Sequence, residues 1–445
     1  MSKRKLSMPD IEINDDFNTV FDLVENQNIN LFLTGNAGTG KSTFLQYLKS
    51  HSSKNIAVVS PTGKAALACG GQTIHSFFKF PHKLLMDDQV KRHRDTRKFE
   101  ELDLLIIDEI SMVRADLMDA IDLSLQLNRN NRDPFGGVQV LLIGDLGQLP
   151  PVVKDKELQD YFENIYEVPY FFAAQVFDEV EVFIYNFEKI YRQQDRQFID
   201  LLNSIRMGSV SEELINTINK RVMRANRKWG LNGLITLTTT NNDAYNINRS
   251  QLEKLKTKEH TFSASIIGKF PEGSFPTDRE LKLKVGAQIM MLVNDPKKRW
   301  VNGTMAKLKK ITDDELTVEI DGLAYPVQRY EWNNIEYTVD RRTGEYADKV
   351  VGTFEQFPVA LAYATTIHKS QGMTLEKVII NLGNGSFSHG QTYVALSRCR
   401  TLDGIFLNVP LTCKDIIFDF HVDDVYSKFH LYTKEQSCTS PSEKA

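Results

Sequence analysis

The sequence predicts an α/β protein with parallel sheets, and three observations lead to this fold class. An apolar run at 29–33 leads directly into a glycine-rich loop and then a helix-like segment. Short apolar runs alternate with helical stretches across residues 29–186, and a second such series begins near residue 187. A β-rich stretch at about 285–355 interrupts the second series. Alternation of strands and helices is typical of parallel sheets covered by helices.

The composition excludes several classes of protein. The chain has 445 residues, of which 41% are hydrophobic and 25% are charged, as in a globular protein of about three domains. Its net charge of −4 means that any nucleic acid must bind in a local basic groove. No apolar run is long enough to span a membrane and the N-terminus lacks a secretory pattern, so we expect no membrane partner. The cysteines form no C-x-x-C pair, which favours a reducing compartment: Cys69, Cys399, Cys413 and Cys438.

The glycine-rich loop carries the most specific signal in the chain. Residues 35–43 read GNAGTGKST, which matches G-x-x-x-x-G-K-[ST] between a predicted strand at 30–33 and a helix near Phe44. In such a loop, backbone N–H groups and a helix N-terminus surround phosphates, the lysine reaches the β- and γ-phosphates, and the serine hydroxyl binds Mg²⁺. We therefore expect a nucleoside triphosphate to bind to Gly35, Ala37, Gly38, Thr39, Gly40, Lys41, Ser42 and Thr43.

The other strands of the first unit follow in order as short apolar runs. They are predicted at 56–59, 104–107, 138–143 and 182–185. Residues 79–100 break the alternation with a polar, basic stretch, which we interpret as an excursion from the first core.

Two of these strands end in side chains that suit hydrolysis. Asp108 ends an apolar strand and can hold the Mg²⁺ opposite Ser42, while Glu109 can polarise the attacking water. Gln148 follows the strand at 138–143, and it could either sense the γ-phosphate or orient the water. The predicted catalytic residues of the first unit are therefore Lys41, Asp108, Glu109 and Gln148, with Ser42 and Asp108 as metal ligands.

The second unit has its own strands and a β-rich interruption. Strands are predicted at 234–239, 360–365, 377–381 and 404–408. Residues 316–321 alternate strictly between apolar and polar side chains before a turn at Asp321-Gly322, which favours a small barrel or meander within 285–355. The Ser-, Lys- and Glu-rich tail at 434–445 is predicted to be disordered.

Two arginines of the second half suit a role in catalysis. Arg192 lies in the segment Ile190-Tyr191-Arg192-Gln193, and Arg398 lies in the densely polar segment 391–400. Arginine fingers that reach the γ-phosphate from a second domain would stabilise the charge of transfer and couple hydrolysis to domain closure. We therefore predict that both arginines are catalytic.

With these motifs in place, the chain resembles superfamily 1 helicases of the 5′-to-3′ class. It is specifically similar to the petite-integration-frequency (Pif-type) DNA helicases, which are relatives of the RecD helicases. The resemblance covers about residues 29–410. Its matches in the first half are GNAGTGKST from Gly35, PTGKAA from Pro61, GQTIHSFF from Gly71, DEISM from Asp108, PFGGVQ from Pro134 and GDLGQLPPV from Gly144. Those in the second half are IYRQ from Ile190, TTTNNDA from Thr238, VNGT from Val301, TIHKSQGMT from Thr366 and VALSRCR from Val394.

The resemblance implies an α/β fold with two RecA-like P-loop domains. The first would cover 1–186, with a small wedge insert at 79–100. The second would cover 187–284 and 356–433, with a small Src-homology-3-like β-barrel inserted at 285–355. One departure concerns the adenine-reading glutamine segment before the P-loop, which is not evident, although Asp16-Phe17-Asn18 lies near the expected place.

The resemblance also implies ATP and Mg²⁺ as cofactors and single-stranded, forked or structured DNA as the partner. Gln371 and Gly372 would join the nucleotide site. We expect a monomer in solution that is cytoplasmic in a bacterium or phage, or nuclear or mitochondrial in a eukaryote. Hydroxyls and lysines suit phosphates, and aromatic rings suit bases. The implied DNA contacts are Pro61, Thr62, Gly63, Lys64, His75, Ser76, Phe77, Asn241, Thr366, His368 and Lys369.

Other nucleotide-binding classes fit less well. A GTPase needs N-K-x-D, and the candidate at 219–222 lacks the aspartate. The L-S-G-G-Q signature of ABC-type ATPases is absent from the sequence. Two alternatives stay open: a nucleotide-gated binding protein without motor action, and a superfamily 1 motor that prefers RNA, because contacts to the 2′-hydroxyl cannot be seen in a sequence.

Overall fold

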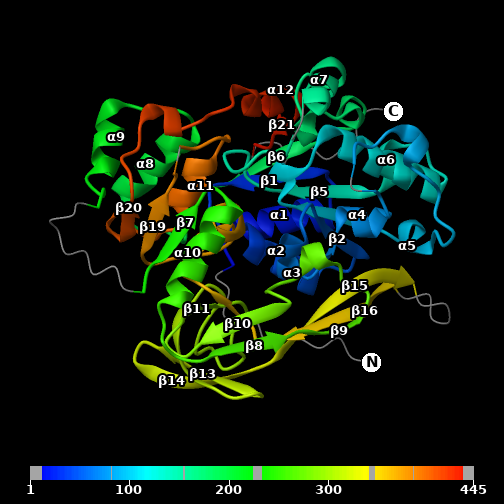
Figure 1. The fold of residues 1–445 in the computed structure, drawn as a ribbon. Coiled ribbons are helices and arrows are strands. Elements are labelled where there is room, and N and C mark those ends of the chain that lie inside the picture. The colour runs from blue at the N-terminus through cyan, green and yellow to red at the C-terminus, as the bar shows by residue number, and fades with distance from the viewer. Residues whose placement is uncertain are drawn as a thin grey trace.

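Two parallel sheets lie side by side, with a β-rich region beneath them, in a computed structural model of the chain (Figure 1). The structure describes residues 13–81, 83–153, 156–223, 233–339, 346–383 and 385–433. The tail predicted at 434–445 lies outside the described residues. Among the described residues, no helix combines the length and apolar character needed to cross a membrane.

The first sheet has seven strands, all parallel to their neighbours, in the order β21-β6-β1-β5-β4-β2-β3. The sequence predicted five of them. The central strands are buried on both faces, which explains their continuous apolar runs. The strands are β1 (Leu31–Gly35), β2 (Ile56–Ser60), β3 (Gln72–Thr73), β4 (Leu104–Asp108), β5 (Gln139–Ile143), β6 (Phe183–Phe187) and β21 (His430–Leu431).

Helices cover both faces of this sheet. One face packs against α1 and α2 through an apolar cluster that includes Phe17, Phe44 and Leu48. The opposite face packs against α4 and α6 through a second cluster that includes Phe77 and Ile121. The helices are α1 (Asp15–Glu25), α2 (Lys41–His51), α3 (Gly63–Cys69), α4 (Ile74–Phe78), α5 (Arg97–Glu100), α6 (Ala115–Arg129) and α7 (Lys156–Ile165).

The second sheet has four parallel strands in the order β18-β7-β19-β20. Its strands are β7 (Ile235–Thr238), β18 (Ala364–Thr366), β19 (Val378–Asn381) and β20 (Ile405–Leu407), and its helices are α8 (Arg196–Arg206), α9 (Glu212–Asn219), α10 (Asn241–Glu253) and α11 (Gln391–Ser397). The single strand predicted at 360–365 is wrong. The chain leaves the β-rich region there, so β17 (Val359–Leu361) pairs antiparallel with β11, and β18 pairs parallel with β7.

The β-rich region is larger than the insert predicted at 285–355. The β8–β10 pair contributes Phe262, Leu281 and Leu283 to the same apolar core as the five-stranded sheet β14-β13-β12-β11-β17. The region therefore begins at β8, and the boundary at 285 is too late. Its other strands are β8 (Glu259–Ser263), β9 (Ser265–Gly268), β10 (Glu280–Lys284), β11 (Gln288–Met291), β12 (Met305–Ile311), β13 (Glu315–Ile320), β14 (Leu323–Gln328), β15 (Tyr330–Val339) and β16 (Tyr346–Gln356).

A long hairpin of this region, β15–β16, reaches the first domain beside α5 (Figure 1). The Tyr337 hydroxyl accepts a hydrogen bond from the N–H of Val58 (3.1 Å), and the N–H of Tyr337 donates to Oε1 of Gln72 (3.2 Å). The ring of Tyr337 is buried among the side chains of the first core. The insert therefore contacts both α/β domains, and not only the one that contains it in sequence.

The end of the described chain returns to the first domain. Residues 356–433 were assigned to the second domain, but α12 (Val425–Lys428) and β21 pack on the first sheet, where β21 extends it beside β6. Phe429 is 2% exposed and packs among the rings of Phe32, Phe171 and Phe177. This apolar anchor, which the sequence analysis missed, places the segment on the first domain.

The stretch at 79–100 is less of an excursion than its composition predicted. Four of its side chains are buried in the first core: Phe80, Leu85, Val90 and Phe99. Lys98 Nζ donates to the carbonyl of Phe77 (2.6 Å) and lies 4.1 Å from the centre of that ring. Its exposed basic residues among those described are Lys79, Lys83, Lys91, Arg92 and Arg94, of which the last three lie close together in sequence.

Candidate functional site

A cleft of about 740 Å³ lies between the two α/β domains, a size that suits a nucleotide. The first domain contributes the glycine-rich loop and the ends of β4 and β5, and the second contributes residues from around α11. The predicted site residues that line it are Ala37, Gly38, Thr39, Gly40, Lys41, Ser42, Thr43, Asp108, Glu109, Gln148, Arg192, Gly372 and Arg398. Gln371 is not among its lining residues, although its neighbour Gly372 is.

The glycine-rich loop holds its phosphate-binding form because three glycines adopt positive φ, the first of them Gly35 at 143°. Gly38 has φ 88° and Gly40 has φ 96°, a region that side chains disfavour. Helix α2 begins at Lys41 without a side-chain cap, so its N-terminal N–H groups remain available to an anion. Lys41 Nζ donates to the carbonyls of Gly35 (2.6 Å) and Asn36 (3.0 Å). Burial lowers the pKa of Lys41, and the Asp145 carboxylate partly offsets this.

Two carboxylates lie at the end of β4, as the sequence predicted. Burial, and then the neighbouring Glu109, raise the pKa of Asp108 to about 7. Burial also raises the pKa of Glu109, against the opposing effects of Lys41 and Arg398. Glu109 has φ 55° and ψ 44°, a left-handed conformation that stores strain and is often found at active sites. Crowded carboxylate oxygens beside the exposed Ser42 hydroxyl form a hard-oxygen donor set that fits Mg²⁺.

Both predicted arginines line the cleft, Arg192 in contact with Gly38 of the glycine-rich loop and Arg398 at the end of α11 in the second domain. Arg192 donates from NH1 to the carbonyl of Ser397 (3.3 Å), and burial together with Arg398 lowers the pKa of Arg192 to about 9. Arg398 is 1% exposed and donates to the carbonyl of Val394 (3.0 Å) and to the Ser397 hydroxyl (2.9 Å). Desolvated cations that face one another favour an anionic ligand between them.

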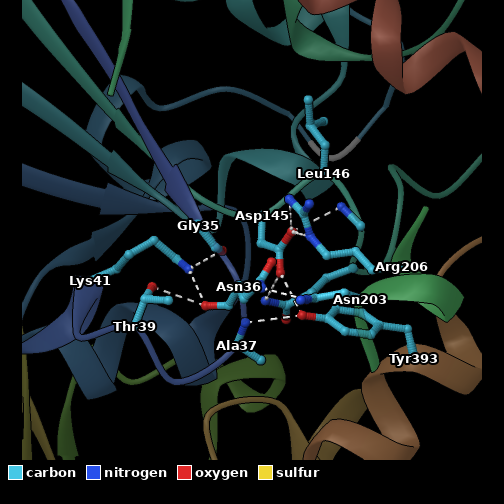
Figure 2. Close-up of polar contacts among 12 residues, drawn as sticks. Gly35, Asn36, Ala37, Thr39, Lys41, Asp145, Leu146, Asn203, Arg206 and Tyr393 are labelled. Atoms are coloured by element: carbon cyan, nitrogen blue, oxygen red, sulfur yellow. Dashed lines mark hydrogen bonds and ion pairs between the residues drawn. The ribbon is translucent and has the colours of Figure 1, made fainter. Parts of the chain in front are cut away.

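The sequence analysis missed a buried polar junction around Asp145 (Figure 2). Asp145 Oδ1 accepts hydrogen bonds from Arg206 Nε (2.9 Å) and from the N–H of Gly147 (3.0 Å). Its Oδ2 accepts from Gln148 Nε2 (3.2 Å) and from the Tyr393 hydroxyl (3.3 Å). Arg206 and Tyr393 belong to the second domain. No sequence signal joins them to Asp145, because the contact depends on how the domains meet.

The analysis also missed two aromatic residues at the cleft. Phe17 of α1 and Tyr191 both line it, and both approach Gly40. Asn14 Nδ2 donates to the Tyr191 hydroxyl (2.9 Å). Phe17 belongs to the Asp16-Phe17-Asn18 segment, whose position before the loop was the available signal.

The predicted DNA contacts divide between the two domains. Thr62 caps α3 by accepting the N–H of Ala65 (3.3 Å), so Pro61, Gly63 and Lys64 lie at that helix start. Lys64 still meets solvent, yet desolvation by the surrounding protein and then Lys369 lower the pKa of Lys64 to about 8. The influence of Lys369 on this pKa indicates that the two domains face each other here. His75, Ser76 and His368 are partly exposed, and Asn241, the first residue of α10, is exposed.

Two of the residues predicted to contact DNA, Phe77 and Thr366, are buried in this structure. Phe77 is fully buried and packs edge-on against Phe78, Phe99 and Tyr337, so its ring has no face for a base. Thr366 is 4% exposed, and its hydroxyl accepts the N–H of Lys369 (3.2 Å). Thr366 therefore shapes the turn that presents Lys369.

Known proteins resemble the whole chain. A model of the PIF1-like helicase family matches residues 12–215. The ATP-dependent DNA helicase Pif1 of Bdellovibrio bacteriovorus is 31% identical over 437 residues, covering 94% of this chain and 93% of its own length. The human ATP-dependent DNA helicase PIF1 is 33% identical over 388 residues, 84% of this chain, but this chain spans only 57% of that protein.

Solved structures agree. Unliganded Pif1 from a Bacteroides species superposes with a TM-score of 0.85 at 38% identity, covering 94% of this chain and 98% of that one. Bacteroides Pif1 bound to single-stranded DNA gives a TM-score of 0.68 at 39% identity, covering 94% and 97%. The arrangement described here is thus closer to that DNA-free structure than to the DNA-bound one, and Bacteroides Pif1 in complex with ADP-AlF4 superposes equally well, with a TM-score of 0.85. The fold of these relatives, with two RecA-like domains, is the fold of this chain, which belongs to the PIF1-like helicase family.

Proposed function

We propose that this protein is an ATP-dependent DNA helicase that translocates 5′-to-3′ on single-stranded DNA and unwinds duplex or structured DNA. One observation carries the proposal: a single interdomain cleft combines the P-loop and two carboxylates of the first domain with Arg192, which lies beside the P-loop, and with the buried Arg398 of the second domain. Opposed donors of this kind stabilise phosphoryl transfer only when the domains are together. Hydrolysis then changes the distance between the domains, and this change moves them along a bound strand.

Each residue has a role that follows from its position. Lys41 leaves the Gly35 and Asn36 carbonyls to hold the β- and γ-phosphates, and Glu109 accepts a hydrogen bond from the attacking water. Arg192 and Arg398 stabilise the charge on the transferring phosphoryl group. Ser42 and Asp108 would hold Mg²⁺, which when bound neutralises phosphate charge. Tyr191, which is 38% exposed at the cleft, offers an aromatic face to the base of ATP, where the adenine-reading glutamine is not evident, and the buried Phe17 packs close by.

We propose that single-stranded DNA is the partner and that it binds along the surface between Lys64 and Lys369. These two lysines lie on opposite domains, and the charge of Lys369 contributes to the lowered pKa of Lys64. Each phosphate neutralised should lower log K by about 0.7 per tenfold increase in salt. We expect Lys64→Ala and Lys369→Ala each to make that dependence shallower. We further propose that the protein is a monomer in solution, which light scattering tests.

A strand-displacement assay tests the function. Purified protein with ATP and Mg²⁺ should unwind a duplex with a 5′ single-stranded tail and leave a matched 3′-tailed duplex intact. Glu109→Gln, prepared in parallel, should bind both substrates and unwind neither. Unwinding from 3′ tails only would contradict the direction, and no DNA-stimulated hydrolysis would favour a binding protein without motor action. Preference for an RNA tail over a DNA tail would favour the RNA motor.

We also propose that residues 79–100 act as a wedge at the fork. The exposed basic residues Lys91, Arg92 and Arg94 are its candidate contacts to the displaced strand or the duplex. Replacing all three by serine should reduce unwinding more than DNA-stimulated ATP hydrolysis. A matched triple variant at exposed lysines 254, 256 and 258 should affect neither. Equal loss of both activities in the first variant would indicate a plain surface loop.

A further inference from the structure

The loop that carries Gln148 is held by the second domain on two sides. On one side, the Arg206 side chain at the end of α8 packs so closely on Gly147 that a Cβ there would lie 2.4 Å from Arg206 Cγ. On the other side, Gly390 before α11 approaches the carbonyl of Gln148, and His389 Nε2 donates to the carbonyl of Leu146 (2.8 Å). The position of this loop therefore depends on where the second domain lies.

One hydroxyl connects this loop to the P-loop. The Tyr393 hydroxyl accepts the N–H of Ala37 (3.0 Å) and donates to Asp145 Oδ2 (3.3 Å), as Figure 2 shows. Burial, and then the Asp145 carboxylate, raise the pKa of Tyr393, so the hydroxyl keeps the proton that it donates. Beside it, Asn36 Nδ2 donates to Asn203 Oδ1 (2.7 Å), a second contact between the P-loop and the second domain.

Asp145 also fixes the orientation of the Gln148 side chain. Because Gln148 Nε2 donates to Asp145 Oδ2, its Oε1 is left free to act as an acceptor in the cleft that Gln148 lines. An acceptor there suits a water hydrogen better than a phosphate oxygen. Of the two roles considered for Gln148, this arrangement favours orienting the water.

The charge of Arg206 matters as much as its hydrogen bonds. Asp145 is 1% exposed, and although burial opposes ionisation, Arg206 and Lys41 hold the pKa of Asp145 below its ordinary value. Without Arg206, a bare carboxylate would face Lys41 from the side where the γ-phosphate binds. It would compete for the lysine and repel the nucleotide.

We propose that Arg206 and Tyr393 are positioning residues for ATP hydrolysis, and that through Asp145 they make the placement of Gln148 depend on the position of the second domain. The inference rests on the proposed function. Besides the arginine fingers, this gives a second way in which the position of the second domain affects hydrolysis. Here Asp145 responds to domain closure without contacting the nucleotide.

Two conservative variants test the proposal. Tyr393→Phe removes only the hydroxyl and its two hydrogen bonds, so kcat for DNA-stimulated ATP hydrolysis should fall roughly tenfold. The KM for ATP and the affinity for a fluorescent ADP analogue should stay within about twofold, because binding does not need Gln148 in place. Tyr337→Phe is the matched control, because its hydroxyl also makes a contact between domains, accepting the N–H of Val58 (3.1 Å), while neither residue lines the cleft, so kcat should stay unchanged.

A double-mutant cycle tests whether the charge of Arg206 acts through Asp145. Arg206→Met should raise the KM for ATP and lower kcat, Arg206→Lys should restore part of both, and adding Asp145→Asn to Arg206→Met should cost little more. Arg114→Lys, in a comparable pair with Asp116, controls for general loss of stability. Melting temperatures show whether each variant folds.

The outcomes separate this inference from the function on which it rests. Wild-type kcat in Tyr393→Phe, an equal fall in Tyr337→Phe, or independent effects of Arg206 and Asp145 would each overturn the positioning role. Wild-type protein that hydrolyses no ATP in the presence of DNA would overturn the proposed function as well.

Discussion

Gly38 of the P-loop and Arg192 are in direct contact: a Cβ on Gly38 would lie 2.4 Å from Arg192 Cβ. The N–H of Tyr191 also donates to the carbonyl of Gly38 (2.9 Å). The segment that carries the first arginine finger is therefore attached to the loop that is proposed to bind the phosphates, whereas Arg398 arrives on α11 from the second domain. The two fingers therefore approach the phosphate site from different parts of the molecule.

The fingers should affect rate more than binding. Arg192→Ala and Arg398→Ala should each lower kcat by roughly 10³- to 10⁵-fold while changing ATP affinity far less, because charge on the γ-phosphate increases at transfer. Steady-state hydrolysis with saturating DNA, alongside nucleotide titration, measures both. A variant that loses affinity with kcat intact would identify that arginine as a ground-state contact.

Substitutions of Lys41 and Glu109, both in the first domain, should impair ATP hydrolysis in different ways. Lys41→Ala should abolish hydrolysis with the fold intact, because Lys41 lies in the cleft and contributes to no apolar cluster. Glu109→Gln should still bind ATP but hydrolyse it slowly, since its amide cannot accept a proton from water. Single-turnover hydrolysis and melting curves distinguish these effects. Near-normal turnover by Glu109→Gln would assign water activation to another group.

DNA affinity should depend on pH through Lys64. Its pKa of about 8 in the free protein must rise when a phosphate binds, because the anion favours the charged amine. Binding then takes up a proton, and affinity falls as pH rises above 8, by up to roughly tenfold at pH 9. Fluorescence anisotropy with a labelled oligonucleotide measures this. Lys64→Arg, which stays charged, should remove most of the pH dependence, and an unchanged profile in that variant would exclude Lys64 as its source.

Phe77 should matter for stability and not for stacking on DNA. Phe77→Ala removes a fully buried ring from the first core and should cost about 3–5 kcal/mol of unfolding free energy. Phe387→Ala, at a side chain that is 62% exposed, should change stability by under about 0.5 kcal/mol. Urea unfolding of both variants gives the comparison. If Phe77→Ala is as stable as the wild type but binds DNA weakly, the prediction that Phe77 contacts a base would be supported.

The sequence was most informative where local structure and chemistry coincide. The P-loop and the Asp108-Glu109 pair each follow a buried strand within a few residues, so strand, loop and side chain could be recognised together. Parallel strands place such ends at one sheet edge, and the cleft formed there. The local sequence could not show that Phe77 belongs to the core, because an aromatic ring in a short helix fits either a core or a base-stacking surface.

Long-range contacts between domains could not be predicted. Arg206 lies on a helix whose apolar face, Phe198, Leu202 and Ile205, explains its sequence without reference to Asp145. The β15–β16 hairpin shows the alternation of a strand, but nothing in it indicates that Tyr337 reaches Val58 in another domain. Such contacts follow from how separately folded units dock, which no periodicity records.

Strand β21, which pairs with the edge of β6, lies about 240 residues after β6 in the sequence. At typical translation rates that distance takes on the order of 10 to 50 s. During this interval the backbone edge of β6 and the apolar site of Phe429 lack their partner, although the P-loop and the other six strands of the sheet have already been made. The first domain thus passes a period on the ribosome with an open sheet edge, which is the kind of surface that pairs with other nascent chains.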